Sequence, residues 1–199
     1  MGYVLVTPPT TEPLSLDDVK AHLRIDADDE DALISALVAA SRQHFERRTG
    51  RSLIDTVWRL VLDRFPPGGG PIRLGNGPVS AVSSVGYIDS AGVSRVLAEE
   101  TGYLADLSGD IGKLSPVFWQ PWPCDAAHRP GGVTVQYTAG FGPTADAVPQ
   151  LVKQALLLLI GHWYENRETV VIPDRTVTIT DVPLAFDAVA DSYQIPLLA

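Results

Sequence analysis

Three side chains in this sequence, His44, His162 and Glu165, have the types and spacing that could bind a metal ion. His162 and Glu165 are three residues apart, so on a helix they share one face, as in carboxylate-bridged metal sites. Such sites need partner carboxylates on a facing helix, and the apolar stripe expected within residues 34–45 offers none. We therefore expect structural or interfacial roles here, with no metal, no cofactor and no catalytic residue. A metal-dependent hydrolase is the enzyme alternative.

Two other motifs could in principle bind a ligand. Residues 109–115 superficially resemble a phosphate-binding loop, but the spacing Gly-x-x-x-x-Gly-Lys-Ser/Thr is absent and no strong apolar strand precedes them. Trp119 and Trp122 lie in a Pro-rich stretch, where large aromatic side chains either pack onto the body or are presented to a partner. A carbohydrate- or peptide-binding module that stacks its ligand on these two rings is the second alternative.

Composition limits the classes of protein to consider. The chain has 199 residues, and its 45% apolar and 20% charged content argues against extensive disorder. The net charge of −9 disfavours binding of a phosphate backbone over the surface as a whole. The single cysteine, Cys124, excludes an intrachain disulfide. We recognise no signal peptide and no membrane span, and expect a protein made in the cytoplasm.

The elements that must position these residues begin with two helices. Ser15 and Asp18 have the spacing of a capping box, which predicts a helix over residues 16–23. A longer helix is expected over residues 28–48, with acidic residues at its start and Gly50 as its stop. Its apolar stripe comprises Ile34, Leu37, Val38, Ser41 and Phe45, and the opposite face carries Asp31, Ser35, Arg42 and Glu46.

The middle of the chain reads as strands and turns. Alternation with a period of two predicts strands near residues 54–62, 72–74, 79–88, 93–97 and 132–138. The stretch from residue 102 to residue 130 is rich in Gly, Pro and Trp, and we expect it to be irregular. Together these segments indicate a compact antiparallel sheet or a small barrel-like insertion.

A last major helix is expected over residues 148–167, with Asp146 as its cap. It is apolar nearly all round between residues 155 and 160, which predicts burial by several neighbours. One face should meet the Ile34–Phe45 stripe. Leu157, Gly161 and Tyr164 are left on the other face, where they need either the β-rich insertion or another subunit. A tail with a short helical stretch near residues 184–191 follows.

The predicted fold class is α+β. A small α-helical bundle is formed by N- and C-terminal helices, with an inserted antiparallel β-rich region and an extended C-terminal tail. The predicted boundaries are residues 1–52 for the N-terminal bundle helices, 53–140 for the β-rich insertion, 141–168 for the C-terminal bundle helix and 169–199 for the tail.

A small basic cluster, Arg47, Arg48 and Arg51, closes the long helix. Cations are favourable at a helix C-terminus, which is a sufficient structural reason for them. The functional interpretation is a contact with acidic residues of a neighbouring copy, such as residues 26–31.

Several stretches together resemble the head-to-tail connector family of long-tailed bacteriophages and gene transfer agents, also called adaptor or head-completion proteins. They are Glu12-Pro-Leu-Ser-Leu-Asp-Asp-Val-Lys-Ala-His-Leu-Arg-Ile, then Arg42-x-x-x-Glu46 with Thr49-Gly-Arg-Ser-Leu53, then Val135-x-Tyr-Thr-Ala-Gly-Phe-Gly142, and Trp163-Tyr-Glu-Asn-Arg-Glu168. Their order and spacing carry the resemblance over nearly the whole chain.

The resemblance implies a non-enzymatic protein in the neck of a virion or phage-like particle. It would form a homo-oligomeric ring, typically of twelve copies, under the portal protein. The ring would extend the DNA channel, let DNA pass without sequence-specific binding, and receive the next neck or tail-connecting protein, with the C-terminal tail docking onto the portal. Predicted partner-binding residues are Arg47, Arg48, Arg51, Leu157, Gly161, Tyr164, Val170, Val171, Ile172, Val177, Ile179 and Tyr193.

Overall fold

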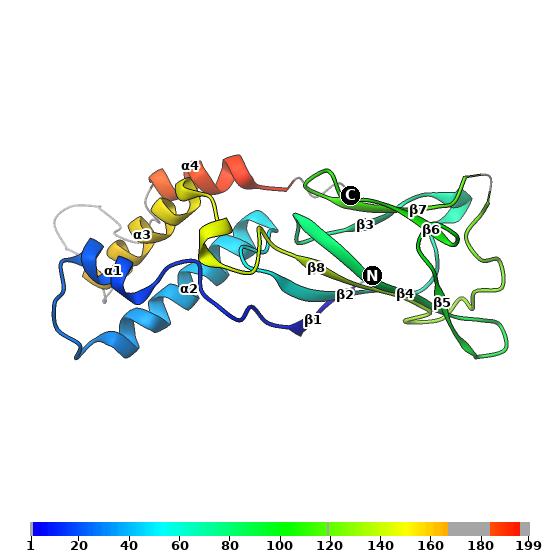
Figure 1. The fold of residues 1–199 in the computed structure, drawn as a ribbon, viewed down its shortest axis with the longest axis horizontal. Helices are drawn as coiled ribbons and strands as arrows, with labels where there is room; N and C mark the ends of the chain where they lie inside the picture. The colour runs from blue at the N-terminus through cyan, green and yellow to red at the C-terminus, as the bar shows by residue number, and fades with distance from the viewer. Residues whose placement is uncertain (1, 119, 167–183, 196–199) are drawn as a thin grey trace, which may run out of the picture.

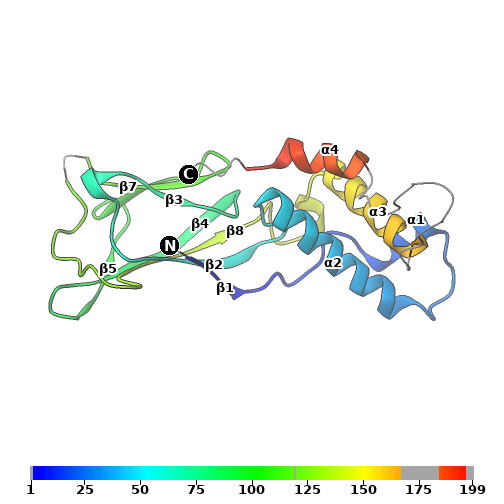
Figure 2. The ribbon, with the colours of Figure 1, turned by 180° about the vertical axis from the view of Figure 1, so that it is seen from behind.

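The structure is a computed structural model, and it describes residues 2–118, 120–166 and 184–195. The molecule is elongated, with a helical bundle at one end and two small sheets at the other (Figures 1 and 2). The N-terminal helices and the C-terminal helices meet in the bundle, and the strands between them form the other end. This is the predicted α+β arrangement.

Local sequence explains where the bundle helices begin and end. The Ser15 hydroxyl accepts a hydrogen bond from the Asp18 amide at 3.1 Å, and the Asp18 carboxylate accepts from the Ser15 amide, so the predicted capping box is present. Gly50 ends the second helix in the left-handed conformation at φ 69°, where glycine carries no steric penalty. The described helices are α1 (Leu16–Leu23), α2 (Asp31–Thr49), α3 (Gln150–Glu165) and α4 (Leu184–Tyr193).

The bundle core forms where α2 and α3 pack against each other. Ile34 and Phe45 of α2 are fully buried, as are Val152, Leu156 and Leu159 of α3. The predicted meeting of the two apolar stripes is therefore confirmed. The predicted cap of α3 is wrong, because Asp146 lies in a short 3-10 turn and Pro149 occupies the N-cap position.

Helix α3 is covered on a further side by α1, which corrects one prediction. Leu157 is only 8% exposed, and a Cβ atom at Gly161 would lie 3.6 Å from Nε2 of His22. The Tyr164 hydroxyl donates a hydrogen bond to the Glu30 carboxylate. These residues therefore make contacts within the helical end of the chain, with no part of the β-rich insertion needed to cover Leu157. The leucines that α3 exposes are Leu151 and Leu158.

The chain after residue 183 returns to the bundle as α4. Phe186 and Ala190 are fully buried, and the Phe186 ring lies 5.9 Å from the Phe45 ring. The Ile195 amide then donates to the Thr49 carbonyl at 2.9 Å. The helical stretch predicted near residues 184–191 is therefore present. It packs on the bundle, because the apolar face of α4 lies against α2 and α3.

The sheets are antiparallel throughout. A five-stranded sheet has the order β1-β2-β8-β4-β5, and a three-stranded sheet has the order β3-β7-β6. The strands are β1 (Gly2–Thr7), β2 (Thr56–Leu62), β3 (Ile72–Leu74), β4 (Val79–Ile88), β5 (Ser94–Leu97), β6 (Tyr103–Asp106), β7 (Gly112–Pro116) and β8 (Val133–Ala139).

Three strands differ from the sequence prediction. Strands β6 and β7 lie in the stretch expected to be irregular, and their turn is stabilised by Asp106, whose carboxylate accepts from the Ser108 amide and hydroxyl. Strand β1 comes from the segment assigned to the bundle, yet it pairs with β2 at the edge of the larger sheet. The N-terminal segment therefore contributes to both ends of the molecule.

A second core lies between the two sheets. Leu60, Val135 and Tyr137 of the larger sheet are fully buried, as is Leu114 of the smaller one. Trp122 closes this core beside Phe65. The structure thus has two separate apolar cores, one in the bundle and one between the sheets.

The packing of α4 can be tested by replacing Phe186 with alanine. We expect Phe186→Ala to lower the free energy of unfolding by about 3–5 kcal/mol, because it removes a fully buried aromatic side chain. The control is Leu184→Ala on the same helix, where the side chain is 86% exposed and the expected change is within about 0.5 kcal/mol. Urea denaturation of both variants measures the difference, and equal stabilities would contradict the docking of α4.

Candidate functional site

A pocket of about 390 Å³ lies where the C-terminal half of α2 meets the start of the sheets. One wall is the N-terminal segment around β1, and the other wall is α2. We call this pocket the junction groove. Its lining residues are Leu5, Pro8, Pro9, Arg42, Gln43, Glu46, Arg47, Arg51, Ser52, Thr56, Trp58 and Asn76.

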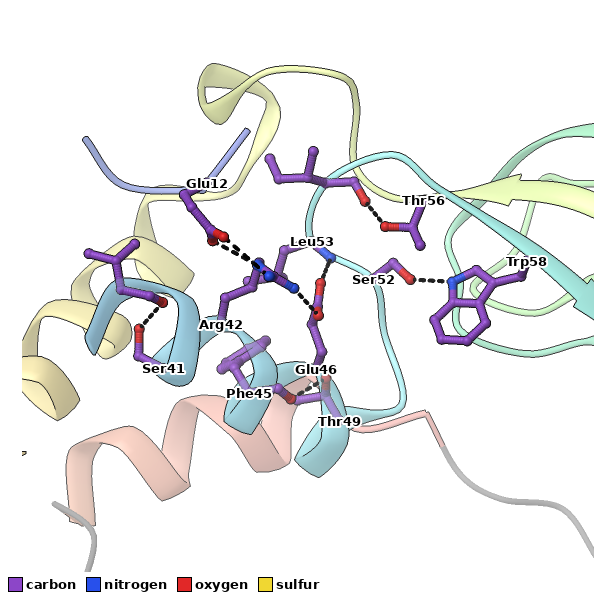
Figure 3. Close-up of polar contacts among 12 residues, drawn as sticks. Glu12, Ser41, Arg42, Phe45, Glu46, Thr49, Ser52, Leu53, Thr56 and Trp58 are labelled. Carbon is purple, nitrogen blue, oxygen red and sulfur yellow. Dashed lines mark hydrogen bonds and ion pairs between the residues drawn. The ribbon is translucent and has the colours of Figure 1, made fainter. Parts of the chain in front are cut away.

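A buried ion network forms the inner wall of the junction groove (Figure 3). Arg42 donates from Nε and from a terminal nitrogen to both oxygens of Glu12, at 2.7 and 3.2 Å, and from its other terminal nitrogen to Glu46 at 2.8 Å. The second oxygen of Glu46 accepts from the Leu53 amide at 2.9 Å. The network therefore ties the N-terminal segment, α2 and the turn into β2 to one another.

Burial and ion pairing shift the pKa values of the residues in this network in opposite directions. Burial raises the pKa of the Glu46 carboxyl, while the Leu53 amide and Arg42 act in the opposite direction. Burial lowers the pKa of Arg42, but its two carboxylate partners offset this, so that its pKa is raised. Arg42 and Glu46 were predicted on the face of α2 opposite its apolar stripe, and Arg42 is nevertheless only 8% exposed.

The floor of the junction groove is largely apolar. The Trp58 indole donates to the Ser52 hydroxyl at 3.0 Å, which holds the ring in place beneath the groove. Beside it, β1 is a sheet edge with exposed apolar side chains, from Tyr3 at 39% to Val4 at 49%. Such an edge presents unpaired backbone groups together with apolar surface, a combination that favours contact with another chain.

The three arginines of the basic cluster have different surroundings. Arg48 pairs with Asp191 of α4 at 2.6 Å. Arg51 is buried, donates to the Tyr193 carbonyl and pairs with Asp110 at 2.8 Å, which lowers the pKa of that carboxyl. Arg47 is exposed at the rim of the groove, and no hydrogen bond or ion pair joins it to another described residue. Only Arg47 among the three therefore presents an uncompensated charge.

The remaining predicted interface residues fall into two groups. Tyr193 packs within the chain, with its ring 6.3 Å from that of Phe45 and 6.4 Å from that of Phe141. Leu157, Gly161 and Tyr164 lie on the side of α3 that α1 covers. The last group, Val170, Val171, Ile172, Val177 and Ile179, lies outside the described residues.

Two of the three residues of the metal hypothesis, His44 and His162, make other contacts, and the third, Glu165, is exposed. The His44 ring packs 5.8 Å from the Trp163 ring and 5.4 Å from the Phe186 ring. His162 lies beside Asn166, whose side chain donates to the His162 carbonyl at 2.9 Å. Within residues 2–118, 120–166 and 184–195, no three His, Cys, Asp or Glu side chains are grouped so that they could hold a metal ion.

Of the two residues of the ligand-stacking hypothesis, Trp122 is described, and it packs within the protein. Trp122 is 5% exposed, stacks on Phe65 with ring centres 4.9 Å apart, and donates to the Gly70 carbonyl at 2.9 Å. Its faces are therefore used in packing. Trp119 lies outside the described residues.

Among the described helices, none is long and apolar enough to cross a membrane.

The comparison with protein families gives a match over residues 13–85, to the phage gp6-like head-tail connector protein family. Over this span, about a third of the chain, the sequence is similar to that family. The matched residues run from the start of the bundle through α1 and α2 into β4, so they include the Arg42–Glu46 pair and the turn to which it bonds. The resemblance to head-to-tail connectors that was predicted from the sequence is thereby confirmed. No curated protein matches the chain.

Solved structures with the same fold come from gene transfer agent particles. A chain in the virion of a native particle is similar over 100% of this chain and 98% of its own length, with 24% identity and a TM-score of 0.77. Chains in the neck of an empty particle computed with C6 symmetry, and of a native particle computed with C12 symmetry, cover the same shares at 24% identity, with TM-scores of 0.74 and 0.73.

These comparisons confirm the fold along its whole length. At this identity the likeness to the particle structures concerns the fold, and the family match concerns residues 13–85. The matched family consists of head-tail connector proteins, and the similar chains come from the virion and the neck of particles. Neither the hydrolase nor the ligand-stacking alternative gains support from them.

The buried network can be tested with Arg42→Met. We expect a loss of about 2 kcal/mol or more at neutral pH, because the variant leaves the buried Glu46 carboxylate without its cation. A carboxyl whose pKa is raised by folding favours the folded state at low pH and disfavours it at high pH. The loss should therefore shrink as the pH falls towards about 4.

Thermal and urea unfolding of the variant across this pH range measures the effect. The control is Arg73→Met on β3, an exposed arginine for which we expect a change within about 0.5 kcal/mol. A loss that is independent of pH, or no loss at all, would contradict the role of the network.

Proposed function

We propose that this chain is a structural head-to-tail adaptor of a phage or phage-like particle. It forms a ring under the portal, extends the DNA channel and joins the head to the tail. The observation that carries the proposal is the family match over residues 13–85, and the agreement of fold along the whole chain supports it.

The ring is supported by the particles in which similar chains occur. The two neck structures were computed with C6 and C12 symmetry, which fits a chain present in several copies around one axis. A ring needs two different surfaces on each subunit that bind each other, because the same contact then repeats around the axis. We propose twelve copies, with the portal protein and the next neck component as neighbours.

The architecture suits a passive part of such a channel. The two cores are joined by ion pairs of the buried Arg42 and Arg51, and the described residues contain no group of three potential metal ligands. The net charge of −9 supports passage of DNA without sequence-specific binding, since an acidic lining repels phosphates. Docking of the C-terminal segment onto the portal stays a prediction, because residues 167–183 and 196–199 are not described.

The function can be tested with the portal protein of the same phage or phage-like particle. We expect the purified chain to bind the assembled portal ring and to form a second ring on it, visible by electron microscopy of the complex. A portal ring from an unrelated phage is the control and should recruit none. Absence of binding to the cognate portal would overturn the proposal, whereas a monomeric state of the isolated chain agrees with assembly on a template.

A further inference from the structure

Arg47 makes no ion pair with another described residue, and it lies at the rim of the junction groove. We propose that the junction groove receives the acidic loop between α1 and α2, residues 24–30, of the next copy in the ring. The inference rests on the proposed function and specifies the contact between its subunits.

The groove has the chemistry of an acceptor for acidic residues. Its rim carries Arg47, exposed and without an ion-pair partner among the described residues, beside the exposed Gln43. Arg42 and Arg51 already hold Glu12, Glu46 and Asp110, so they contribute to the walls and not to free charge. The apolar floor around Trp58 lets a bound segment bury its own apolar atoms beside the charge.

The loop has the chemistry of the donor. Asp26 and Asp29 are exposed, and no ion pair joins either of them to another described residue. The loop is also tied to α1, because the Lys20 ammonium bonds to Asp28 of the loop at 2.6 Å and to Asp31, the first residue of α2, at 2.9 Å. A loop that is already ordered loses little conformational freedom on binding, so its carboxylates are presented at low entropic cost.

The loop and the junction groove of one chain are too far apart to bind each other. The loop precedes the first residue of α2, whereas Arg47 lies near the last, and the intervening helix of sixteen residue steps spans about 24 Å. Figure 1 shows the loop at the outer end of the bundle and the other end of α2 beside the sheets. A contact between such separated patches is heterologous, so it closes into a ring when the rotation between copies allows.

Charge exchange tests this contact on the cognate portal ring. We expect Arg47→Glu and Asp29→Lys each to weaken ring assembly at least about tenfold, because each places like charges together in the contact. The double variant carrying both changes restores an opposite-charge pair and should assemble within about threefold of the unaltered chain. The matched control Arg73→Glu changes the same charge on exposed β3 and should assemble normally.

The outcomes separate this inference from the proposed function. If the unaltered chain forms rings and both single variants do so equally well, or the double variant stays as weak as the singles, the inference fails while the proposed function stands. If the unaltered chain does not bind the portal, both fail. Unfolding curves of each variant serve as the control that it is folded. Assembly of the unaltered chain should weaken as the salt concentration rises from about 0.05 to about 0.5 M, because salt screens exposed charges.

A crosslink provides a second measurement that does not depend on charge. In a Cys124→Ser background, which removes the single native thiol, Gln43→Cys and Asp29→Cys are combined in one chain. Under oxidising conditions, rings assembled on the portal should give a ladder of disulfide-linked multimers. The same pair with Arg73→Cys in place of Gln43→Cys should remain monomeric, and a ladder absent from the first pair would overturn the contact.

Discussion

Helix α3 has apolar side chains around most of its circumference, and the rest of the bundle is arranged to cover them. α2 takes the side with Val152 and Leu159, α1 takes the side with Leu157 and Gly161, and α4 adds Phe186. These covering helices come from both ends of the chain, so the β region between them must leave the bundle and return to it. The elongated shape follows from this constraint.

The joint between the bundle and the sheets is polar, in contrast to the cores on either side of it. Arg42 and Arg51 make directional bonds to carboxylates and carbonyls at this joint. Apolar packing tolerates small rotations, whereas charged hydrogen bonds fix distance and angle together. The orientation of the sheets relative to the bundle is therefore set by a few bonds, and the family match covers the residues that form the central ones.

Features encoded by neighbouring residues could be predicted from the sequence. The capping box at Ser15 gives α1 at its predicted bounds, Gly50 ends α2, and alternation gives β4 over Val79–Ile88. Features that depend on distant residues could not. The sequence pattern alone does not predict that Arg42 is buried. Its burial depends on Glu12, thirty positions earlier, which the fold places beside it. In the same way, β6 and β7 lie in a stretch rich in Gly and Pro and are specified by pairing with each other and with β3. The helix of α4 was predicted, but its docking on α2 and α3 was not.

The presence of two apolar cores also shapes how the molecule opens. Each core holds its own set of buried side chains, and the joint contributes ion pairs but little shared apolar packing. Domains built this way tend to exchange amide protons and unfold in separate cooperative units. We therefore expect the sheets to unfold locally while the helical bundle stays folded. One end of the subunit could then change shape against a neighbour without destabilising the other end.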